Sequence, residues 1–199
     1  MGAIHKIHLT NNMKILQTPN ISSYTTQKKG FILHGTLGKY DGAVNWLMMA
    51  VKDRPTLIYS SAHYVISKLG EITQLATNDK VTWHAGTVRN PTWRARKYLP
   101  TKTGVPGTTY PQVQIGNKRI KESDFFKNPN DSFIGIELEW FEGDIVTEAQ
   151  YGTIVNIIKS SGIKDPIVLS HSEITEGKGD FGRDAKGMLP VQEVLRRLK

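Results

Sequence analysis

Cysteine is absent from this chain of 199 residues. Its absence excludes disulfide bridges, thiolate zinc sites and cysteine nucleophiles. Any metal ion that the protein binds must therefore be held by histidine and carboxylate side chains.

Long apolar stretches are also missing, since a run such as Trp46–Val51 is far short of the roughly 20 residues that span a bilayer. We therefore expect no membrane span. The N-terminal segment MGAIHKIHLTNNMKILQ has neither a continuous apolar block nor a small-residue cleavage site. It lacks the features of a secretory signal, which predicts synthesis in the cytoplasm.

Acidic residues are in the minority, because 18 Asp and Glu stand against 26 Lys and Arg, for a net charge of +8. This balance favours binding to polyanions, which include nucleic acid, an anionic membrane and an anionic cell wall. Charge alone does not choose among them. The length and the ordinary share of hydrophobic residues, 38%, predict one domain over residues 1–199 with a full hydrophobic core.

Two short apolar segments each deliver a histidine. Gly30–His34 (GFILH) and Pro166–Ser170 (PIVLS), which His171 follows, have the composition of buried strands. We therefore expect His34 and His171 to lie at strand ends.

A third apolar segment carries two carboxylates. In Ser132–Trp140 (SFIGIELEW) the apolar residues alternate with Gly135, Glu137 and Glu139. A strand would place both glutamates on one face, and either of them could face a functional site.

Helical patterns separate these strands. Apolar residues at helical spacing over residues 44–51 predict an amphipathic helix that Pro55 helps to end. A capping box at Thr147–Gln150 begins a second helix, which Gly162 ends. Residues 191–198 predict a final helix.

A hairpin is expected earlier in the chain. Thr56–Ile66 is rich in β-branched and aromatic residues, and a turn then leads into a second strand at Ile72–Leu75. Strands and helices alternate, which predicts an α/β fold with a central mixed β-sheet flanked by helices and a zinc site at the strand ends.

Between residues 87 and 132 the pattern breaks into a Pro- and Gly-punctuated stretch with nine Lys or Arg and three acidic residues. A loop of this length is usually functional or flexible, so this basic insertion is a candidate substrate wall. A nucleic-acid surface is an alternative, because cations are interleaved there with an aromatic residue at Trp93, Arg94, Arg96 and Lys97. We favour a solvated face or a cell-wall contact over nucleic acid.

His34, His171 and Asp180 form a possible metal-binding set. Asp180 lies in a glycine-punctuated loop after His171 (GKGDFG). Two imidazoles and a carboxylate can bind a catalytic zinc ion and leave a fourth position open for water. Taken singly, each histidine is better explained as a hydrogen-bonded polar residue. His63, inside an apolar segment, is expected to be such a structural histidine.

Five sequence blocks carry a resemblance to a known family: FILHGT, SAHYVISKLGEITQL, WHAG, SFIGIELEW, and LSHSEIT followed by GKGD. In this order they resemble the type 2 N-acetylmuramoyl-L-alanine amidases. That family includes amidase-type phage lysozymes, anhydromuramyl-peptide amidases and peptidoglycan recognition proteins. The resemblance covers most of the chain outside the basic insertion, and it implies cleavage of the bond between N-acetylmuramic acid and L-alanine in peptidoglycan.

The resemblance also implies roles for individual residues. The zinc ligands would be His34, His171 and Asp180. Glu137 would act as general base, and Lys178 would stabilise the oxyanion together with the metal. His84, in WHAG, would contact the substrate, and the alternative is a histidine that only packs.

Alternatives stay open for two of these roles. Glu139 competes for the role of general base because it would share a strand face with the first glutamate. Asp184 competes with Asp180 as a ligand, although the Lys-x-Asp spacing favours Asp180. Family members with an aspartate ligand often continue with Pro-Gly, whereas Phe181–Gly182 follows here.

The expected function is that of a hydrolase rather than a non-catalytic peptidoglycan-binding module, because all three expected ligands are present. The lack of a signal and of a separate wall-binding domain suits a phage endolysin or a cytoplasmic enzyme that recycles anhydromuropeptides. The positive charge favours the endolysin, which would act on the wall after release and bind anionic wall polymers.

Overall fold

The structure is a computed structural model that describes residues 13–102, 125–178 and 185–199. Its centre is a six-stranded sheet in the order β1-β5-β4-β7-β3-β8. Among these described strands, β4 and β5 are antiparallel and all other neighbours are parallel. The strands are β1 (Lys14–Ile15), β3 (Gly30–Gly35), β4 (Tyr64–Ile66), β5 (Ile72–Gln74), β7 (Phe133–Leu138) and β8 (Ile167–Ser170).

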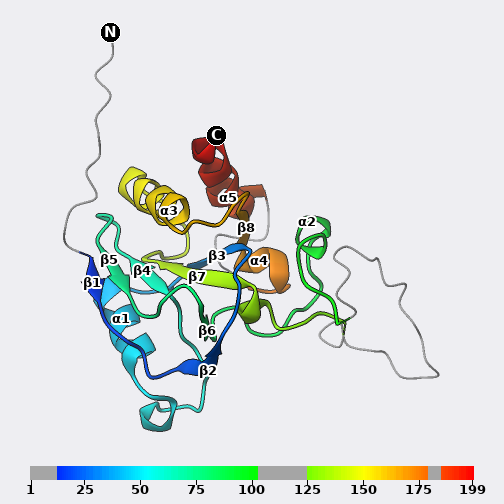
Figure 1. Cartoon of the computed structure of the whole chain (residues 1–199). Helices are drawn as coiled ribbons and strands as arrows, with labels where there is room; N and C mark the ends of the chain where they lie inside the picture. The colour runs from blue at the N-terminus through cyan, green and yellow to red at the C-terminus, as the bar shows by residue number, and fades with distance from the viewer. Residues whose placement is uncertain (1–12, 103–124, 179–184) are drawn as a thin grey trace.

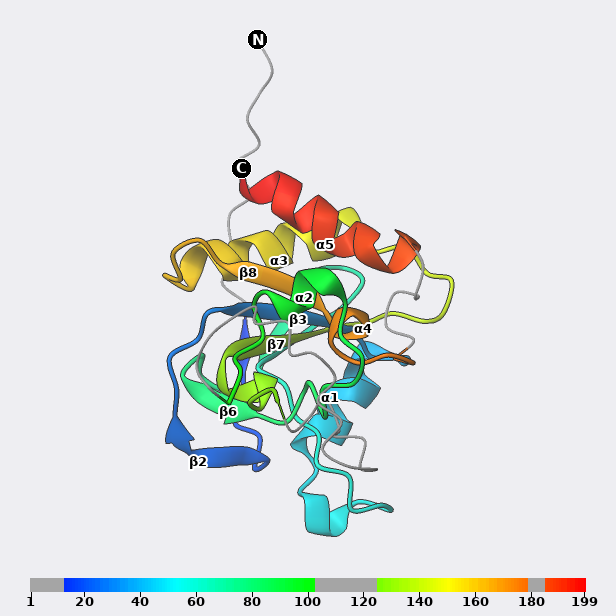
Figure 2. The same cartoon turned by 90° about the vertical axis from the view of Figure 1, so that its right-hand side faces the viewer.

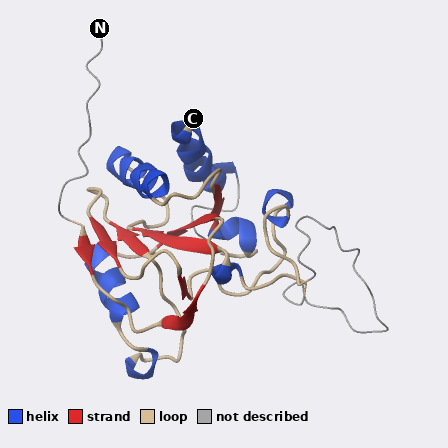
Figure 3. Cartoon of the chain, viewed as in Figure 1, coloured by secondary structure: helices blue, strands red, loops and turns tan. Residues whose placement is uncertain are grey.

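Helices cover both faces of this sheet (Figure 1, Figure 3). α3 (Glu148–Ser160) and α5 (Ala185–Leu198) lie on one face, and α1 (Tyr40–Met48) lies on the other. The predicted α/β fold with a central mixed sheet flanked by helices is therefore confirmed. The shorter elements are β2 (Ile21–Thr25), β6 (Lys80–Thr82), α2 (Trp93–Arg96), α4 (His171–Ile174), and the 3-10 turns η1 (Val51–Asp53) and η3 (Pro129–Asp131). In the described segments, no helix has the length and apolar character that a bilayer crossing needs.

The central strands are buried on both faces, which explains why their sequences are almost continuously apolar. One face packs against α3 and α5 through a core that includes Phe31, Leu33, Ile134, Ile136, Leu138, Ile154, Ile158, Val168, Val191 and Val194. The opposite face contributes Ile32, Phe133 and Leu169 to a second core. Each such side chain stabilises the fold by about 1.5–3 kcal/mol on burial.

The strands predicted around residues 30–34, 132–140 and 166–170 are β3, β7 and β8, with ends that differ by at most two residues. The predicted capping box is also confirmed. The hydroxyl of Thr147 accepts the backbone N–H of Gln150 at 3.1 Å, and the Gln150 side-chain oxygen accepts the N–H of Thr147 at 3.0 Å. α3 begins directly after it because these bonds satisfy N–H groups of the first turn.

The strand predicted over residues 56–66 is mostly wrong, although its hairpin with β5 is confirmed. Only the last three residues form β4, and the residues before them form a loop. Arg54 donates hydrogen bonds to the carbonyl oxygens of Ile58 and Ser60, so these groups are satisfied without a neighbouring strand. The apolar side chains that suggested a strand are exposed to solvent: Leu57, Ile58 and Tyr59.

The first predicted helix is α1, which ends at Met48 rather than reaching Val51. The Asn20 side chain donates hydrogen bonds to the carbonyl oxygens of Leu47 and Met49. These bonds satisfy carbonyl groups that are left open at a helix end. Val51 therefore lies in the separate turn η1.

The predicted basic insertion, about 87–132, contributes to the core in its described parts. It contains α2 and η3. Four of its side chains are buried in the second core beside β3 and β8: Val88, Ala95, Leu99 and Phe126. Residues 103–124 lie outside the described part of the chain, so the extent of the insertion stays a prediction.

Gly30 allows β3 and β8 to approach closely. A Cβ atom at this position would lie 1.9 Å from the carbonyl oxygen of Ile167, so we expect Gly30→Ala to lower the free energy of unfolding by about 3 kcal/mol through overpacking. Gly152→Ala in α3 is the matched control, because no atom lies within 4 Å of its added Cβ and alanine favours the helix by about 1 kcal/mol. Urea unfolding measures the stability of both variants. A Gly30→Ala variant as stable as the wild type would contradict the close approach of β3 and β8.

Candidate metal and catalytic site

The parallel register of the central strands gathers side chains that are far apart in sequence. His34 in β3 is paired with Glu137 in β7, and Leu33 is paired with Ser170 at the end of β8. Paired positions project from the same face of a sheet. His34, Glu137 and His171, which directly follows β8, therefore meet at the carboxyl ends of three adjacent parallel strands. Figure 2 shows these strands, β7, β3 and β8, side by side.

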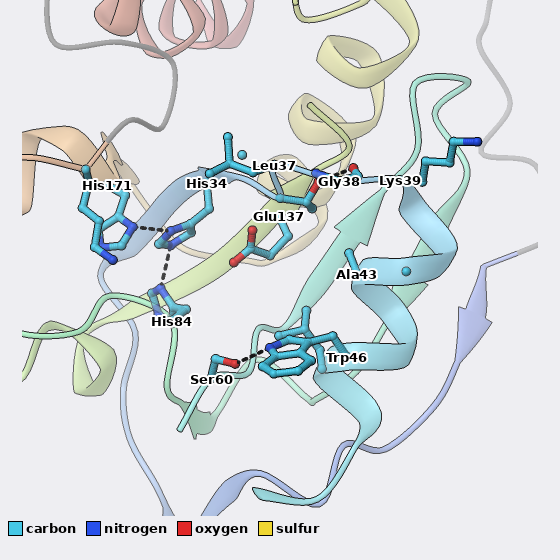
Figure 4. A pocket seen from close by; sticks show the side chains of 15 residues that line it. His34, Leu37, Gly38, Lys39, Ala43, Trp46, Ser60, His84, Glu137 and His171 are labelled. Carbon is cyan, nitrogen blue, oxygen red and sulfur yellow. Dashed lines mark hydrogen bonds between the residues drawn. The ribbon is translucent and has the colours of Figure 1, made fainter. Parts of the chain in front are cut away.

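Three imidazoles form a row at this end of the sheet (Figure 4). The Nδ1 atoms of His34 and His171 lie 3.0 Å apart, and Nε2 of His34 lies 3.0 Å from Nδ1 of His84. All three residues are buried. His84 follows β6 and packs against β7 at Gly135, where an added Cβ would lie 2.4 Å from its ring atom Cγ. Glycine at this position leaves the space that the third ring occupies.

The positions of the hydrogens on these rings follow from the backbone carbonyl oxygens that the rings contact, because a carbonyl oxygen only accepts hydrogen bonds. Nε2 of His171 lies 3.1 Å from the oxygen of Ala85, and Nε2 of His84 lies 3.1 Å from the oxygen of Phe133. Both Nε2 atoms therefore carry a hydrogen, and in the neutral ring Nδ1 of His84 accepts the hydrogen on Nε2 of His34. As neutral rings, His34 and His171 both present Nδ1 as an acceptor at their 3.0 Å contact.

Two facing acceptors fit a metal cation. Their lone pairs repel each other unless a proton or a cation lies between them, and zinc binds neutral imidazole nitrogen. Burial, together with the neighbouring His171, holds the pKa of His34 well below its ordinary value, which favours the neutral form that a metal requires. The described residues alone hold no set of three His, Cys, Asp or Glu side chains suited to a metal. Asp180, the predicted third ligand, and its rival Asp184 lie outside them.

The two candidate bases occupy different places. Glu137 lines the pocket beside the row of imidazoles (Figure 4). Glu139 lies beyond the end of β7, and its Oε2 accepts a hydrogen bond from the backbone N–H of Lys68 at 2.9 Å. Glu139 is absent from the residues that line the pocket. The geometry therefore favours Glu137 over Glu139 for work on a bound substrate.

Lys178 lines the same pocket from the loop that follows α4. The residue is exposed, and its positive charge is among the causes that lower the pKa of His34. A cation at this position can stabilise negative charge that develops in the pocket. Its catalytic role stays a prediction. Substrate contact by His84 also stays a prediction, and both nitrogens of that ring are hydrogen-bonded within the protein.

One wall of the pocket has no counterpart among the sequence predictions. Trp46 of α1 lines the cavity, whose volume is about 420 Å³, and its indole N–H donates to the hydroxyl of Ser60 at 3.0 Å (Figure 4). The guanidinium of Arg54 lies over the Trp46 ring and also donates to Ser60. The helical spacing in α1 marks its buried face, and Trp46 lies outside that spacing, so the pattern carries no signal for it.

His63 is a structural histidine, as the sequence predicts. Its Nε2 donates to the carbonyl oxygen of Lys80 at 2.9 Å, and its Nδ1 accepts the backbone N–H of Gly135 at 3.0 Å. Burial lowers the pKa of His63 to about 3. The neutral ring thus joins β6 to β7 behind the row of imidazoles.

Arg94 is engaged inside the protein, which weakens the nucleic-acid interpretation of the basic insertion. Its Nε lies 2.8 Å from Oε1 of Glu173, and its guanidinium also donates to the carbonyl oxygen of Val168. Glu173 is 1% exposed. The ion pair joins α2 to α4, the helix that His171 begins. Trp93 is exposed, but Lys97 lies over its ring.

Glu137, Lys178 and three buried histidines thus line one pocket at the ends of the central strands. The sequence profile described as N-acetylmuramoyl-L-alanine amidase matches residues 24–183. The chain belongs to this family, as the five sequence blocks indicate, and its class of activity is that of an amidase acting on peptidoglycan. A search of curated proteins gives no match.

Solved structures share the fold. The selenomethionine derivative of AmpD aligns with a TM-score of 0.54 and 20% identity over 90% of this chain and 94% of that chain. The N-acetylmuramoyl-L-alanine amidase LysC from Clostridium intestinale URNW has a TM-score of 0.51 and 16% identity over 93% and 97% of the two chains. A mutant endolysin from Bacillus subtilis has a TM-score of 0.52 and 15% identity over 94% and 99%. At these identities the likeness shows the fold alone.

Loss of the Arg94 guanidinium should destabilise the fold. Arg94→Met leaves the buried carboxylate of Glu173 without its cation, which we expect to lower the free energy of unfolding by about 3 kcal/mol. Lys97→Met removes an exposed cation at the C-cap of the same short helix and should change stability by less than about 1 kcal/mol. Thermal and urea unfolding compare the variants. Equal effects of the two substitutions would show that the ion pair between Arg94 and Glu173 makes no specific contribution to stability.

Proposed function

We propose that this protein is a zinc-dependent enzyme that hydrolyses the amide bond between N-acetylmuramic acid and L-alanine in peptidoglycan. Family membership supports the amide bond and the substrate class. The observation that supports the metal is the 3.0 Å contact between the Nδ1 atoms of His34 and His171, beside Glu137. We assign His34, His171 and Asp180 as the ligands, and Asp180 rests on the sequence resemblance alone.

The residues of the pocket would divide the work of hydrolysis. The chemistry that zinc supplies when bound is polarisation of a carbonyl group and activation of water. Glu137 accepts the proton of the attacking water and donates it to the departing alanine nitrogen. Lys178 stabilises the negative charge that develops on the carbonyl oxygen. Trp46, held by Ser60, is a rigid wall against which the substrate can pack.

The biological role that we favour is that of a phage-type endolysin, a bacteriolytic and antimicrobial hydrolase. The net charge of +8 supports this role, because anionic wall polymers would hold a basic enzyme on its substrate. Salt screens such attraction. Lysis of whole cell walls that is unchanged in high salt would contradict this electrostatic contact.

Purified sacculi test the reaction directly. We expect the protein to release stem peptides that begin with L-alanine, to lose this activity with a chelator and to regain it with zinc. Mass spectrometry identifies the products. Release of the same peptides in the presence of chelator would contradict the proposed dependence on a metal. Intact sacculi would direct the test to soluble anhydromuropeptides, whose cleavage indicates a recycling amidase and whose persistence indicates a non-catalytic binding module.

Substitution of the proposed base distinguishes Glu137 from Glu139, which lies just beyond the end of β7. Glu137→Gln should lower the rate of cleavage about 100-fold or more, because the amide cannot accept the proton of water. Glu139→Gln is the matched control, since its side-chain oxygen can still accept the N–H of Lys68. Initial rates of peptide release measure both. Full activity of Glu137→Gln, or equal losses in the two variants, would exclude the assigned role.

A further inference from the structure

We propose that His84 is a positioning residue, which fixes the orientation of His34 by accepting the hydrogen on its Nε2 and so directs the Nδ1 atom of His34 toward the metal. The inference rests on the proposed zinc site and deepens it. It assigns a role to a residue that sequence resemblance places near the substrate instead.

The direction of the hydrogen bonds along the row follows from its last member. The carbonyl oxygen of Phe133 requires a hydrogen on Nε2 of His84, at 3.1 Å. In the neutral ring, Nδ1 of His84 is then an acceptor, and Nε2 of His34 at 3.0 Å must be the donor. A neutral His34 with its hydrogen on Nε2 has its lone pair on Nδ1. That is the nitrogen that faces His171.

The position of His84 is fixed independently of the imidazole row. The side-chain oxygen of Asn130 accepts the backbone N–H groups of both His84 and Ala85, at 3.0 and 2.8 Å. The backbone carbonyl oxygen of Asn130 in turn accepts a hydrogen bond from the buried ammonium of Lys28 at 2.8 Å. On the other side, the ring packs against Gly135, where no side chain fits. These bonds and this close contact hold the backbone and the ring of His84 against β7.

Ala85, the residue after His84, orients the other proposed ligand, His171, in the same way. The carbonyl oxygen of Ala85 accepts the hydrogen on Nε2 of His171 at 3.1 Å. Two successive residues, one through its side chain and one through its backbone, thus hold the far nitrogens of both proposed ligands. Partners of this kind orient metal-binding imidazoles, and their loss typically lowers metal affinity by about 10–100-fold.

Direct binding by His84 fits the structure less well. Both of its ring nitrogens are hydrogen-bonded to protein atoms, and the residue is 7% exposed. A metal or a substrate would have to displace one of these bonds. The row of contacts therefore favours action through His34.

Zinc affinity of the full chain tests the role without substrate. Competition with a chromophoric chelator should show about 10–100-fold weaker zinc binding for His84→Leu, which cannot accept the hydrogen of His34. His84→Asn, whose side-chain oxygen can take the place of Nδ1, should retain affinity within about threefold. The matched control is His63→Leu, which removes another buried imidazole. The centroid of the His63 ring lies 5.9 Å from that of the His84 ring. It should leave zinc affinity unchanged, because His63 bonds to β6 and β7 rather than to a ligand.

Nitrogen-15 NMR of wild-type His34 gives a second test that does not depend on the folding of any variant. With zinc bound, we expect Nε2 to carry the hydrogen and Nδ1 to show the shift of a metal-bound nitrogen. Zinc on Nε2, or His84→Leu with wild-type zinc affinity, would overturn the positioning role while leaving the proposed function intact. A wild-type protein that binds no zinc would overturn both.

Discussion

A slip of one residue between β3 and β7 would turn His34 and Glu137 to opposite faces of the sheet, because side chains alternate along a strand. The register that pairs them is held by the apolar side chains on the other face, where Phe31 and Ile134 are fully buried against α3 and α5. The core on one side of the sheet thus determines the geometry of the site on the other.

A second constraint is the network of buried polar groups behind the imidazoles, whose members form hydrogen bonds with one another. Lys28 is 8% exposed and donates to the backbone of Asn130, and burial lowers its pKa to about 8. Asn130 in turn holds the segment that contains His84. Among the buried side-chain nitrogen and oxygen atoms of the described residues, only Oγ1 of Thr26 has no hydrogen-bond partner. Satisfied networks of this kind rigidify a core, since each broken bond would leave a costly polar group.

Local patterns predicted those parts of the fold that local interactions decide. The capping box of α3 and the apolar strands that carry His34 and precede His171 can be recognised from short stretches of sequence, and the structure contains all of them, with strand ends that differ by at most two residues. The segment before β4 has the composition of a strand, yet it has no strand to pair with, and Arg54 satisfies its carbonyl groups instead. Composition does not reveal such a long side chain reaching back across a loop.

By itself, the sequence determined the family, the α/β class, the absence of thiolate ligands and the choice of two histidines at strand ends, because these depend on residue types and on short spacings. Tertiary structure alone decided which glutamate lies in the pocket, that Trp46 forms its wall, and that His84 and Ala85 hold the far nitrogens of two imidazoles. These features depend on contacts between segments about 50 to 100 residues apart, whose positions follow only from the packing of the whole sheet.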